Sequence, residues 1–516
     1  MKKIRVRFAP SPTGPLHIGG VRTALYNYLL ARKEGGTFIL RIEDTDRTRF
    51  VTGAEAYIKE ALSWFGMVPE EGPDQGGAYG PYRQSERKER YREQVQMLLE
   101  KGKAYRAFDT PEEIAAMKEA WQAKGVHSPK YDAVTRQSMR NSLTLSPSEV
   151  EELVASGAPH VVRLLVDPGR EVAFEDEIRG EVRFSTSELD DKVLLKGDGM
   201  PTYHLANVVD DYHMKITHVI RGEEWLSSTP HHVLLYEAFG WRAEMPVFAH
   251  LPLILKPSGK GKLSKRDGAK FGFPVFPMDW EAEDETHYLG FREAGFLPSA
   301  VINFLAFLGW NPGGEQEIFT MEELVEVFTP QNIVKSGARF DYDKALWFNQ
   351  QHIMKCTVEE LYEMVKDRVQ SAYGVLDAPY VKEIIPLMQE RIKTLNEFVP
   401  STRFFFTEDW AYEAKMIRKK WKEDSPRHLK ALKDVLQGLD PFEAPAIEAM
   451  VRDFIQENAL SFGAIMPLLR IGLTGTMKGP DLYKSMEIIG RERSIQRLER
   501  ALEAFPAIKA GGQHPG

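Results

Sequence analysis

The sequence has almost none of the residues that build covalent or metal-bound frameworks. It contains one cysteine, Cys356, among 516 residues. This excludes an internal disulfide framework and any zinc or iron–sulfur site made of several thiolates. Because scarce cysteine is typical of a reducing compartment, we expect a cytoplasmic protein.

Long apolar runs are also missing. The longest, residues 300–310, is interrupted by Asn303 and is far shorter than the roughly 20 residues of a membrane-spanning helix. The N-terminal residues 1–7 lack the apolar segment of a secretory signal. The sequence therefore predicts neither export nor a membrane partner.

The chain carries no excess of positive charge. Its 67 Lys and Arg stand against 75 Asp and Glu, a formal net charge of −8, so the average composition does not predict a nucleic-acid partner. The local exception is segment 415–433, which holds eight Lys and Arg, two acids and Trp421, with Trp410 just before it. This segment suits a nucleic-acid backbone, although a solvated helix face is the usual interpretation of one charge run.

The first residues predict a strand, a loop and a helix. Apolar and basic residues alternate over 4–8 until two prolines end the pattern, a Gly- and Pro-rich loop covers 13–20, and 21–32 has helical spacing. A second strand, 38–42, ends in the acidic stretch 43–46. This order begins a βαβ unit, and open α/β sheets bind ligands at the carboxyl ends of their strands.

The rest of the chain predicts an interruption of this sheet and then a helical half. Residues 110–152 are polar and predicted helical, 161–200 contain short β-like runs, and 203–220 resume the pattern of helix and strand. Beyond about residue 281 we predict amphipathic helices at 285–293, 299–308, 321–328, 358–370, 380–398, 427–438, 445–457, 462–472 and 491–504. At about 100–200 residues per domain, the chain has room for three to five domains.

Two Gly-rich segments have the composition of phosphate-binding loops. His17-Ile18-Gly19-Gly20 precedes a predicted helix, where free N–H groups and the helix dipole favour an anion. Lys262-Leu263-Ser264-Lys265-Arg266 is flanked by glycines, and positioned lysines can stabilise a phosphoryl or nucleotidyl transition state. Each motif alone is more often a plain turn or a solvated loop.

Seven short motifs occur in a fixed order along the chain. They are Phe8-Ala9-Pro10-Ser11-Pro12-Thr13-Gly14, His17-Ile18-Gly19-Gly20, Arg41-Ile42-Glu43-Asp44-Thr45-Asp46, Gly80-Pro81-Tyr82-Arg83-Gln84-Ser85-Glu86-Arg87, Tyr203-His204-Leu205-Ala206-Asn207-Val208-Val209-Asp210-Asp211, Val219-Ile220-Arg221-Gly222-Glu223-Glu224-Trp225 and Lys262-Leu263-Ser264-Lys265. This set resembles bacterial-type glutamyl-tRNA synthetase, a class I aminoacyl-tRNA synthetase. The matching blocks cover about residues 4–272, and the helical remainder is similar in layout.

The resemblance implies an α/β Rossmann-like catalytic domain with an α+β insertion, followed by an all-α C-terminal anticodon-binding region. It implies these segments: 1–104 and 201–250 as the two halves of the catalytic domain, 105–200 as an acceptor-end insertion, 251–348 as a stem-contact domain with the Lys-Leu-Ser-Lys loop, 349–410 and 411–508 as helical anticodon-binding subdomains, and 509–516 as a disordered tail. The implied activity is ATP-dependent ligation of L-glutamate to the 3′-terminal adenosine of tRNA(Glu), through glutamyl-adenylate. We expect ATP to bind with Mg²⁺ and the protein to act as a monomer.

The resemblance also implies roles for individual residues. Glutamate would be bound by Arg7, Ala9, Ser11, Glu43, Tyr203, Asn207 and Arg221. ATP would be bound by His17, Gly19, Gly20, Glu224, Trp225, Lys262 and Lys265, of which His17, Lys262 and Lys265 would be catalytic. Two arginines suit a dianionic substrate, because guanidinium matches carboxylate in bidentate geometry. No enzyme base is required, since the substrate carboxylate is already ionised.

Structural roles remain open for several of these residues. Tyr203 and Trp225 could be core aromatics, and Asp44 and Asp46 could cap a helix rather than bind a ligand.

Two positions depart from the family pattern. The segment after Tyr105 has no cysteine where some members carry a zinc knuckle, so we predict no structural zinc. Gly20 stands where the class motif has histidine, but glycine is common there in the glutamyl branch.

Three other functions compete with the favoured one. A glutaminyl-tRNA synthetase would leave Arg221 as a buried cation beside a neutral amide. The truncated glutamyl-queuosine modifying enzyme lacks a C-terminal region such as 330–508. A catalytically silent tRNA-binding paralogue would have lost His17, Lys265 or Arg221, and all three are present.

Segment 387–395 resembles the stretch in which discriminating glutamyl-tRNA synthetases place an arginine against the third anticodon base. Arg391 occupies that position. Glutamate and glutamine anticodons differ there, C against G, and a guanidinium pairs with the acceptors of cytosine but would meet the donors of guanine. The alternative is an Arg391 that pairs with Glu390 or another nearby acid.

Overall fold

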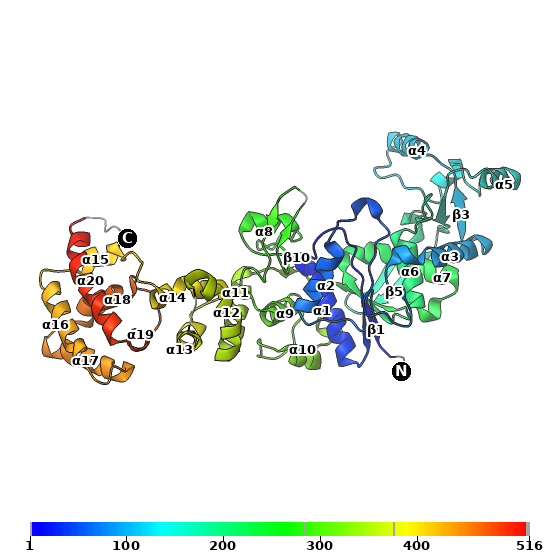
Figure 1. Ribbon diagram of the computed structural model, residues 1–516. Coiled ribbons are helices and arrows are strands. Elements are labelled where there is room, and N and C mark those ends of the chain that lie inside the picture. The colour runs from blue at the N-terminus through cyan, green and yellow to red at the C-terminus, as the bar shows by residue number, and fades with distance from the viewer. Residues whose placement is uncertain (1–2, 283, 375–376, 512–516) are drawn as a thin grey trace. The chain divides into compact units, whose positions relative to one another are not determined.

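The computed structural model describes residues 3–282, 284–374 and 377–511, and the chain forms two compact units (Figure 1). The first unit contains residues 1–293 and 298–345, and the second contains 294–297 and 346–516. No helix of the described residues is long and apolar enough to cross a membrane.

The first unit begins with the predicted βαβ arrangement. Strands β1 (Arg5–Phe8) and β2 (Thr37–Leu40) pair in parallel, and helix α1 (Ile18–Lys33) connects them. Val6 and Phe8 are buried, as the alternation of the first strand predicts. The backbone N–H of Thr217 donates to the carbonyl of Arg5 at 2.9 Å, so β1 lies beside the segment that leads into β8 (His218–Gly222).

Residues 105–200 form most of a separate small subdomain and also contribute two strands to a larger sheet. The subdomain consists of the antiparallel sheet β3-β4-β7 (Ala104–Ala107, Val161–Leu164 and Val193–Leu195) and the helices α4 (Pro111–Ala123) and α5 (Pro147–Ala155). Strands β5 (Glu171–Asp176) and β6 (Gly180–Ser185) instead join β9 (Val247–Leu251) and β8 in a four-stranded sheet of order β6-β5-β9-β8. Part of the predicted insertion is therefore continuous with the sheet that carries β8.

The remaining elements of the first unit cover these sheets or extend them. The helices are α2 (Ala54–Trp64), α3 (Lys88–Glu100), α6 (Tyr203–His213), α7 (Thr229–Phe239), α8 (Lys265–Phe271), α9 (Pro298–Ala306) and α10 (Met321–Val327). The short strands are β10 (Ile254–Leu255) with β13 (Ala338–Arg339), and β11 (Trp280–Glu281) with β12 (His287–Tyr288). A core cluster that includes Leu205, Val219 and Phe248 joins the four-stranded sheet to α3, α6 and α7.

The predicted helix at 285–293 is wrong. The chain forms the antiparallel pair β11–β12 there, and the N–H of Ala282 donates to the carbonyl of Thr286 at 3.0 Å. Glu285 adopts a φ of 62°, in the left-handed region, which ends any helical run at that residue.

The second unit is helical, as predicted. Its helices are α12 (Val358–Tyr373), α13 (Ala378–Gln389), α14 (Phe398–Phe406), α15 (Ala414–Lys420), α16 (Ser425–Gln437), α17 (Ala444–Glu457), α18 (Phe462–Thr474), α19 (Leu482–Ile489) and α20 (Arg491–Lys509), and α11 (Tyr342–Lys355) spans the boundary of the units. Sequence periodicity missed α11, α14, α15 and α19. The predicted tail begins too early, because α20 includes Lys509; residues 512–516 lie outside the described part.

The single helix predicted at 380–398 is broken. Helix α13 ends at Gln389, and α14 begins only at Phe398. Between them the carbonyl of Lys393 accepts from Asn349 Nδ2 at 2.6 Å and the N–H of Leu395 donates to Gly295 at 2.9 Å. Tertiary partners therefore take the backbone groups that a continuous helix would use.

Candidate active site

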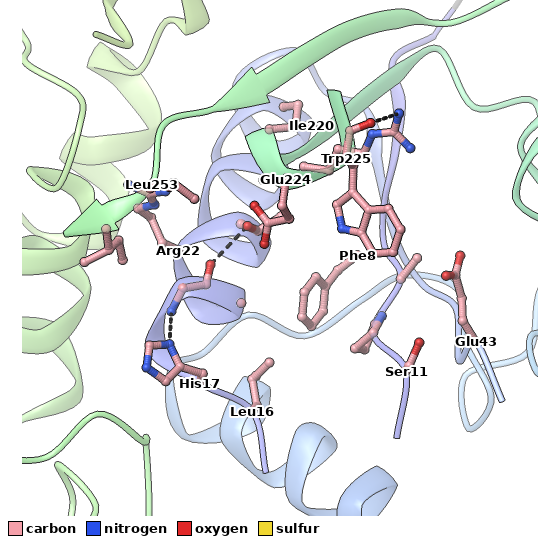
Figure 2. Close-up of a pocket in the computed structure, with 18 of the residues that line it drawn as sticks. Phe8, Ser11, Leu16, His17, Arg22, Glu43, Ile220, Glu224, Trp225 and Leu253 are labelled. Carbon is pink, nitrogen blue, oxygen red and sulfur yellow. Dashed lines mark hydrogen bonds between the residues drawn. The ribbon is translucent and has the colours of Figure 1, made fainter. Parts of the chain in front are cut away.

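A cavity of about 280 Å³ opens where β1 and β8 end and α1 begins (Figure 2). The predicted residues that line it are Arg7, Ala9, Ser11, His17, Gly19, Gly20, Glu43, Tyr203, Asn207, Arg221, Glu224, Trp225 and Lys262. Lys265 is not among the lining residues. The structure thus brings together motifs that are more than 200 residues apart in the sequence.

One wall of the cavity is a network of buried charges. Asp211 accepts from Arg7 Nε at 3.1 Å and from Arg41 Nη1 at 2.7 Å. Glu43 accepts from Arg41 Nη2 at 3.0 Å and from Asn207 Nδ2 at 3.1 Å. The network holds Arg7 and Glu43 in fixed positions, and it spaces a cation and an anion along the same wall.

The pKa shifts of the two carboxyl groups have opposite signs, because Asp211 accepts hydrogen bonds from both Arg7 and Arg41 whereas Glu43 accepts from Arg41 but not from Arg7. Burial raises the pKa of Glu43, and the attraction of Arg41 and Arg7 does not fully offset it. Burial also disfavours the charge of Asp211, but Arg7 and Arg41 outweigh it and lower the pKa of that carboxyl. A bound cation beside Glu43 would therefore stabilise its ionised form.

Arg221 is 5% exposed and also lines the cavity. Its Nη1 donates to the Tyr203 hydroxyl at 2.7 Å, and its Nη2 donates to Thr229 Oγ1 at 2.8 Å. Its Nε donates to His250 Nε2 at 3.0 Å. Among the described residues, the groups that accept from this guanidinium are uncharged.

The aromatic pair Tyr203 and Trp225 covers the pocket rather than filling the core. Their ring centroids are 4.3 Å apart, and Trp225 is 40% exposed. A core role for Trp225, which the sequence left open, does not fit this exposure. A flat exposed indole beside the cavity can pack against a planar ligand group.

His17 is placed to donate to an anion. It caps α1, and its Nδ1 accepts from the Gly19 N–H at 3.1 Å, so the proton of the neutral ring is on Nε2. Burial, followed by Lys265 and Lys262, lowers the pKa of His17 to about 4, and the ring is neutral at pH 7. Nε2 is buried and has no hydrogen-bond partner among the described residues, which leaves one donor for a ligand.

The two lysines of the basic loop occupy different places. Lys262 Nζ pairs with Glu224 Oε1 at 2.9 Å at the open side of the cavity. Lys265 begins α8, and a Cβ added to Gly14 would lie 2.9 Å from its Nζ. Burial lowers the pKa of Lys265.

The α8 end of this loop is fixed by its own residues. Ser264 and Asp267 form a capping box, in which Asp267 Oδ2 accepts from the Ser264 N–H at 2.8 Å.

The acidic residues that follow β2 have different roles: Glu43 lines the cavity, whereas Asp44 and Asp46 bind neighbouring protein groups. Asp46 caps a short 3₁₀ turn by accepting from the Thr48 N–H at 3.2 Å, and Asp44 accepts from the Ser85 hydroxyl at 2.5 Å. The capping alternative is therefore confirmed for Asp46.

Sequence reasoning missed Arg41 and Asp211, which link Arg7 to Glu43. Both residues belong to motifs quoted in the sequence analysis: Arg41 opens the motif 41–46, and Asp211 closes the motif 203–211. That membership was the signal that could have identified them.

The predicted tRNA-contacting residues lie in the second unit. Arg391 is exposed in the turn after α13, and its side chain forms no ion pair among the described residues. The structure therefore does not show the alternative in which Arg391 pairs with Glu390.

The basic segment 415–433 contains Trp421, which is 5% exposed. Its ring centroid lies 5.3 Å from that of Phe505. Trp421 is a core residue and is not available to stack on a base.

No group of three or more His, Cys, Asp or Glu side chains in the described ranges is arranged to hold a metal ion. The absence of structural zinc stays a prediction.

Comparison with known proteins identifies two regions. Residues 3–347 match the model of the catalytic domain of class I tRNA synthetases (E and Q), and residues 360–502 match an anticodon-binding domain. The glutamate–tRNA ligase of Amoebophilus asiaticus is 53% identical over 98% of this chain and 99% of its own length. That of Porphyromonas gingivalis is 52% identical over 98% of this chain and 99% of its own.

A solved structure agrees with these matches. The crystal structure of a glutamate tRNA ligase from Elizabethkingia meningosepticum, in complex with its amino acid, is 46% identical and superposes with a TM-score of 0.94 over 98% of this chain and 100% of that one. The predicted resemblance and the predicted fold class are confirmed. With its catalytic-domain match, its anticodon-binding match and its full-length relatives, the chain belongs to the class I tRNA synthetases of the glutamate and glutamine branch.

Proposed function

We propose that the protein ligates L-glutamate to tRNA(Glu) with ATP, through glutamyl-adenylate. The observation that carries the proposal is Arg221, a buried cation that lines the cavity and donates to uncharged protein groups. A carboxylate of the substrate supplies the missing negative charge, whereas the neutral amide of glutamine does not. The named ligases that match over the full chain support this choice of amino acid.

The buried charges of Arg7 and Glu43 suit the second carboxylate and the ammonium group of glutamate. Arg7 faces the cavity and binds one substrate carboxylate, while Glu43 binds the ammonium group. Ala9, Ser11, Tyr203 and Asn207 line the space between these charges and complete the pocket. The arrangement has one cation for each carboxylate and one anion for the amine.

The start of α1 suits the phosphates of ATP. His17 Nε2–H donates to a phosphate oxygen, and Gly19 and Gly20 bring backbone close to the anion. Lys262 and Lys265 offset the charge that develops on the α-phosphate and on departing pyrophosphate. Glu224 and Trp225 line the adenosine side.

Catalysis by this site consists of positioning and charge stabilisation. The ionised carboxylate of glutamate attacks phosphorus itself, so the protein supplies no base or nucleophile. Mg²⁺ bound to ATP would supply further neutralisation of the triphosphate charge.

The second unit is the proposed tRNA-reading part. Its match to an anticodon-binding domain over residues 360–502 supports an anticodon-binding role for the region as a whole. The subdivision into 349–410 and 411–508 is proposed as predicted from the sequence, and exposed Arg391 is the proposed reader of the third anticodon base. The boundaries of the catalytic halves, the insertion and the stem-contact domain are proposed as predicted from the sequence. We further propose a monomer that acts in the cytoplasm.

The test is charging of purified tRNA(Glu) and tRNA(Gln) with each amino acid. Glutamate on tRNA(Glu) is the expected product. Glutamine on tRNA(Gln) would identify a glutaminyl-tRNA synthetase, and tRNA binding without any charging would identify a silent paralogue.

A further inference from the structure

Three buried side chains meet on neighbouring strands behind the cavity. Arg221 on β8 lies opposite His250 on β9 in the parallel register, and β5 pairs with β9 at Asp176 and Phe248. The exposed fractions of Asp176, His250 and Arg221 are 2%, 0% and 5%. The sheet itself therefore lines up a carboxylate, an imidazole and a guanidinium.

The contacts among them are short and directional. Asp176 Oδ2 is 2.5 Å from His250 Nδ1, and His250 Nε2 is 3.0 Å from Arg221 Nε. The other carboxylate oxygen, Oδ1, accepts from the backbone N–H groups of Ile178 at 3.1 Å, Arg179 at 2.9 Å and His250 at 3.3 Å. Both oxygens of Asp176 are thus committed as acceptors.

These contacts fix the tautomer of His250. The acceptor-only carboxylate requires the proton on Nδ1, and the guanidinium, which only donates, requires a bare Nε2. Burial lowers the pKa of His250, opposed by the Asp176 hydrogen bond, and the ring stays neutral. A second proton on this ring would point an N–H at the N–H of Arg221.

We propose that Asp176 and His250 are positioning residues that hold Arg221 in the orientation in which it binds the substrate carboxylate. This inference rests on the proposed function of the same pocket. Arg7 meets the carboxylate of Asp211 directly, whereas a neutral ring separates Arg221 from Asp176. Arg221 is therefore oriented without a direct ion pair, and its charge remains available to the ligand.

The arrangement also gives β5 a role in amino-acid binding. Asp176 belongs to the stretch 105–200 that the sequence assigned to the insertion, yet it acts on a cavity residue through one intervening side chain.

Asp176→Asn is the sharpest test. Three backbone donors occupy the place of Oδ1, so the new amide must put its oxygen there and its NH₂ against His250 Nδ1. The ring then carries its proton on Nε2, where it can donate to Thr229 Oγ1, 3.1 Å away, but can no longer accept from Arg221 Nε. An Asp-to-Asn change reverses a histidine tautomer in the same way in the serine-protease triad. We expect the KM for glutamate to rise about tenfold to a hundredfold at saturating ATP and tRNA(Glu), the range for losing a hydrogen bond to a charged group. The KM for ATP should not change.

Two substitutions of His250 separate positioning from stability. His250→Asn keeps a donor to Asp176 but offers nothing to Arg221, whereas His250→Gln reaches Arg221 with its carbonyl oxygen but loses the Nδ1 donor. We expect His250→Asn to be the more stable variant in thermal unfolding and the weaker binder of glutamate. If the more stable of these two His250 variants also bound glutamate more tightly, the proposal would be overturned. This comparison can be made even if Asp176→Asn fails to fold.

Asp191→Asn is the matched control, because Asp191 is another fully buried carboxylate that binds Tyr105 and Arg136 away from the cavity. It should lose stability without a change in the KM for glutamate. If folded Asp176→Asn had an unchanged KM for glutamate, the positioning role would be overturned. The proposed function would still stand as long as the wild-type protein charges glutamate. Wild-type protein that charges no glutamate would overturn both.

Discussion

The cavity of the first unit and the helical second unit place their functional charges differently. In the cavity, Arg7, Arg221 and Glu43 are buried and each is held by several hydrogen bonds. In the second unit, the candidate anticodon reader Arg391 is exposed in a turn. Under the proposed function, the small substrate would meet preoriented charges, whereas an anticodon base would meet an exposed side chain.

Buried charge in the second unit serves packing instead. Arg497 is 1% exposed, and it donates to Glu408, to the carbonyl of Phe404 at 2.7 Å and to that of Leu473 at 2.9 Å. It also lies 4.5 Å from the ring of Trp410. One guanidinium therefore ties α14, α18 and α20 together, and no ligand is needed to explain its burial.

The largest expected effect comes from Arg221. Arg221→Gln removes a buried cation from its anionic ligand, which costs about 3–5 kcal/mol, so the KM for glutamate should rise by about 10²-fold to a few times 10³-fold. Steady-state charging at varied glutamate measures it, with the exposed Arg183→Gln as control. An unchanged KM would refute the proposed pocket.

Breaking the buried arginine of the second unit should affect stability rather than chemistry. Arg497→Leu leaves the carbonyls of Phe404 and Leu473 without this donor, whereas Glu408 keeps Arg493, and the change should destabilise the second unit by about 2 kcal/mol or more. Thermal unfolding is the measurement, and the half-exposed Arg493→Leu should cost less than about 1 kcal/mol. Equal effects of the two variants would contradict the distinction.

The basic loop should affect the chemical step and leave glutamate binding alone. Lys265→Ala should slow adenylate formation by on the order of 10²-fold, because the lost contact acts on the transition state. Single-turnover kinetics separate this from binding, and Lys270→Ala on the same helix is the control. Near wild-type rates would place the phosphate chemistry elsewhere.

The smallest effect, a change in the choice of tRNA, is expected for Arg391, the proposed reader of the third anticodon base. Arg391→Gln should raise charging of tRNA(Gln) relative to tRNA(Glu) by about tenfold, the scale of one hydrogen bond to a charged group. Competition between the two tRNAs gives the ratio directly. Comparable charging of both by the wild-type protein would refute the role of Arg391 and leave the cavity unaffected.

Local patterns predicted the elements that depend on local physics. The βαβ start, the helical second half and the clustering of Gly-rich motifs near strand ends follow from periodicity and turn residues. The break between α13 and α14 was not predictable in this way, because Asn349 and Gly295 supply the competing hydrogen bonds from distant positions. Residues 285–293 are not helical for a more local reason: His287–Tyr288 pairs with Trp280–Glu281 as an antiparallel strand.

The sequence by itself determined the family, the activity class and most of the residues that face the cavity, since short motifs carry the groups that phosphate and carboxylate require. Only the tertiary structure decided which charged residues work together. Asp211 joins Arg7 to Arg41, and Asp176 reaches Arg221 through His250, across sequence separations that no local pattern records. The physical reason is that a buried charge is stabilised by whichever partner the fold brings within hydrogen-bonding distance.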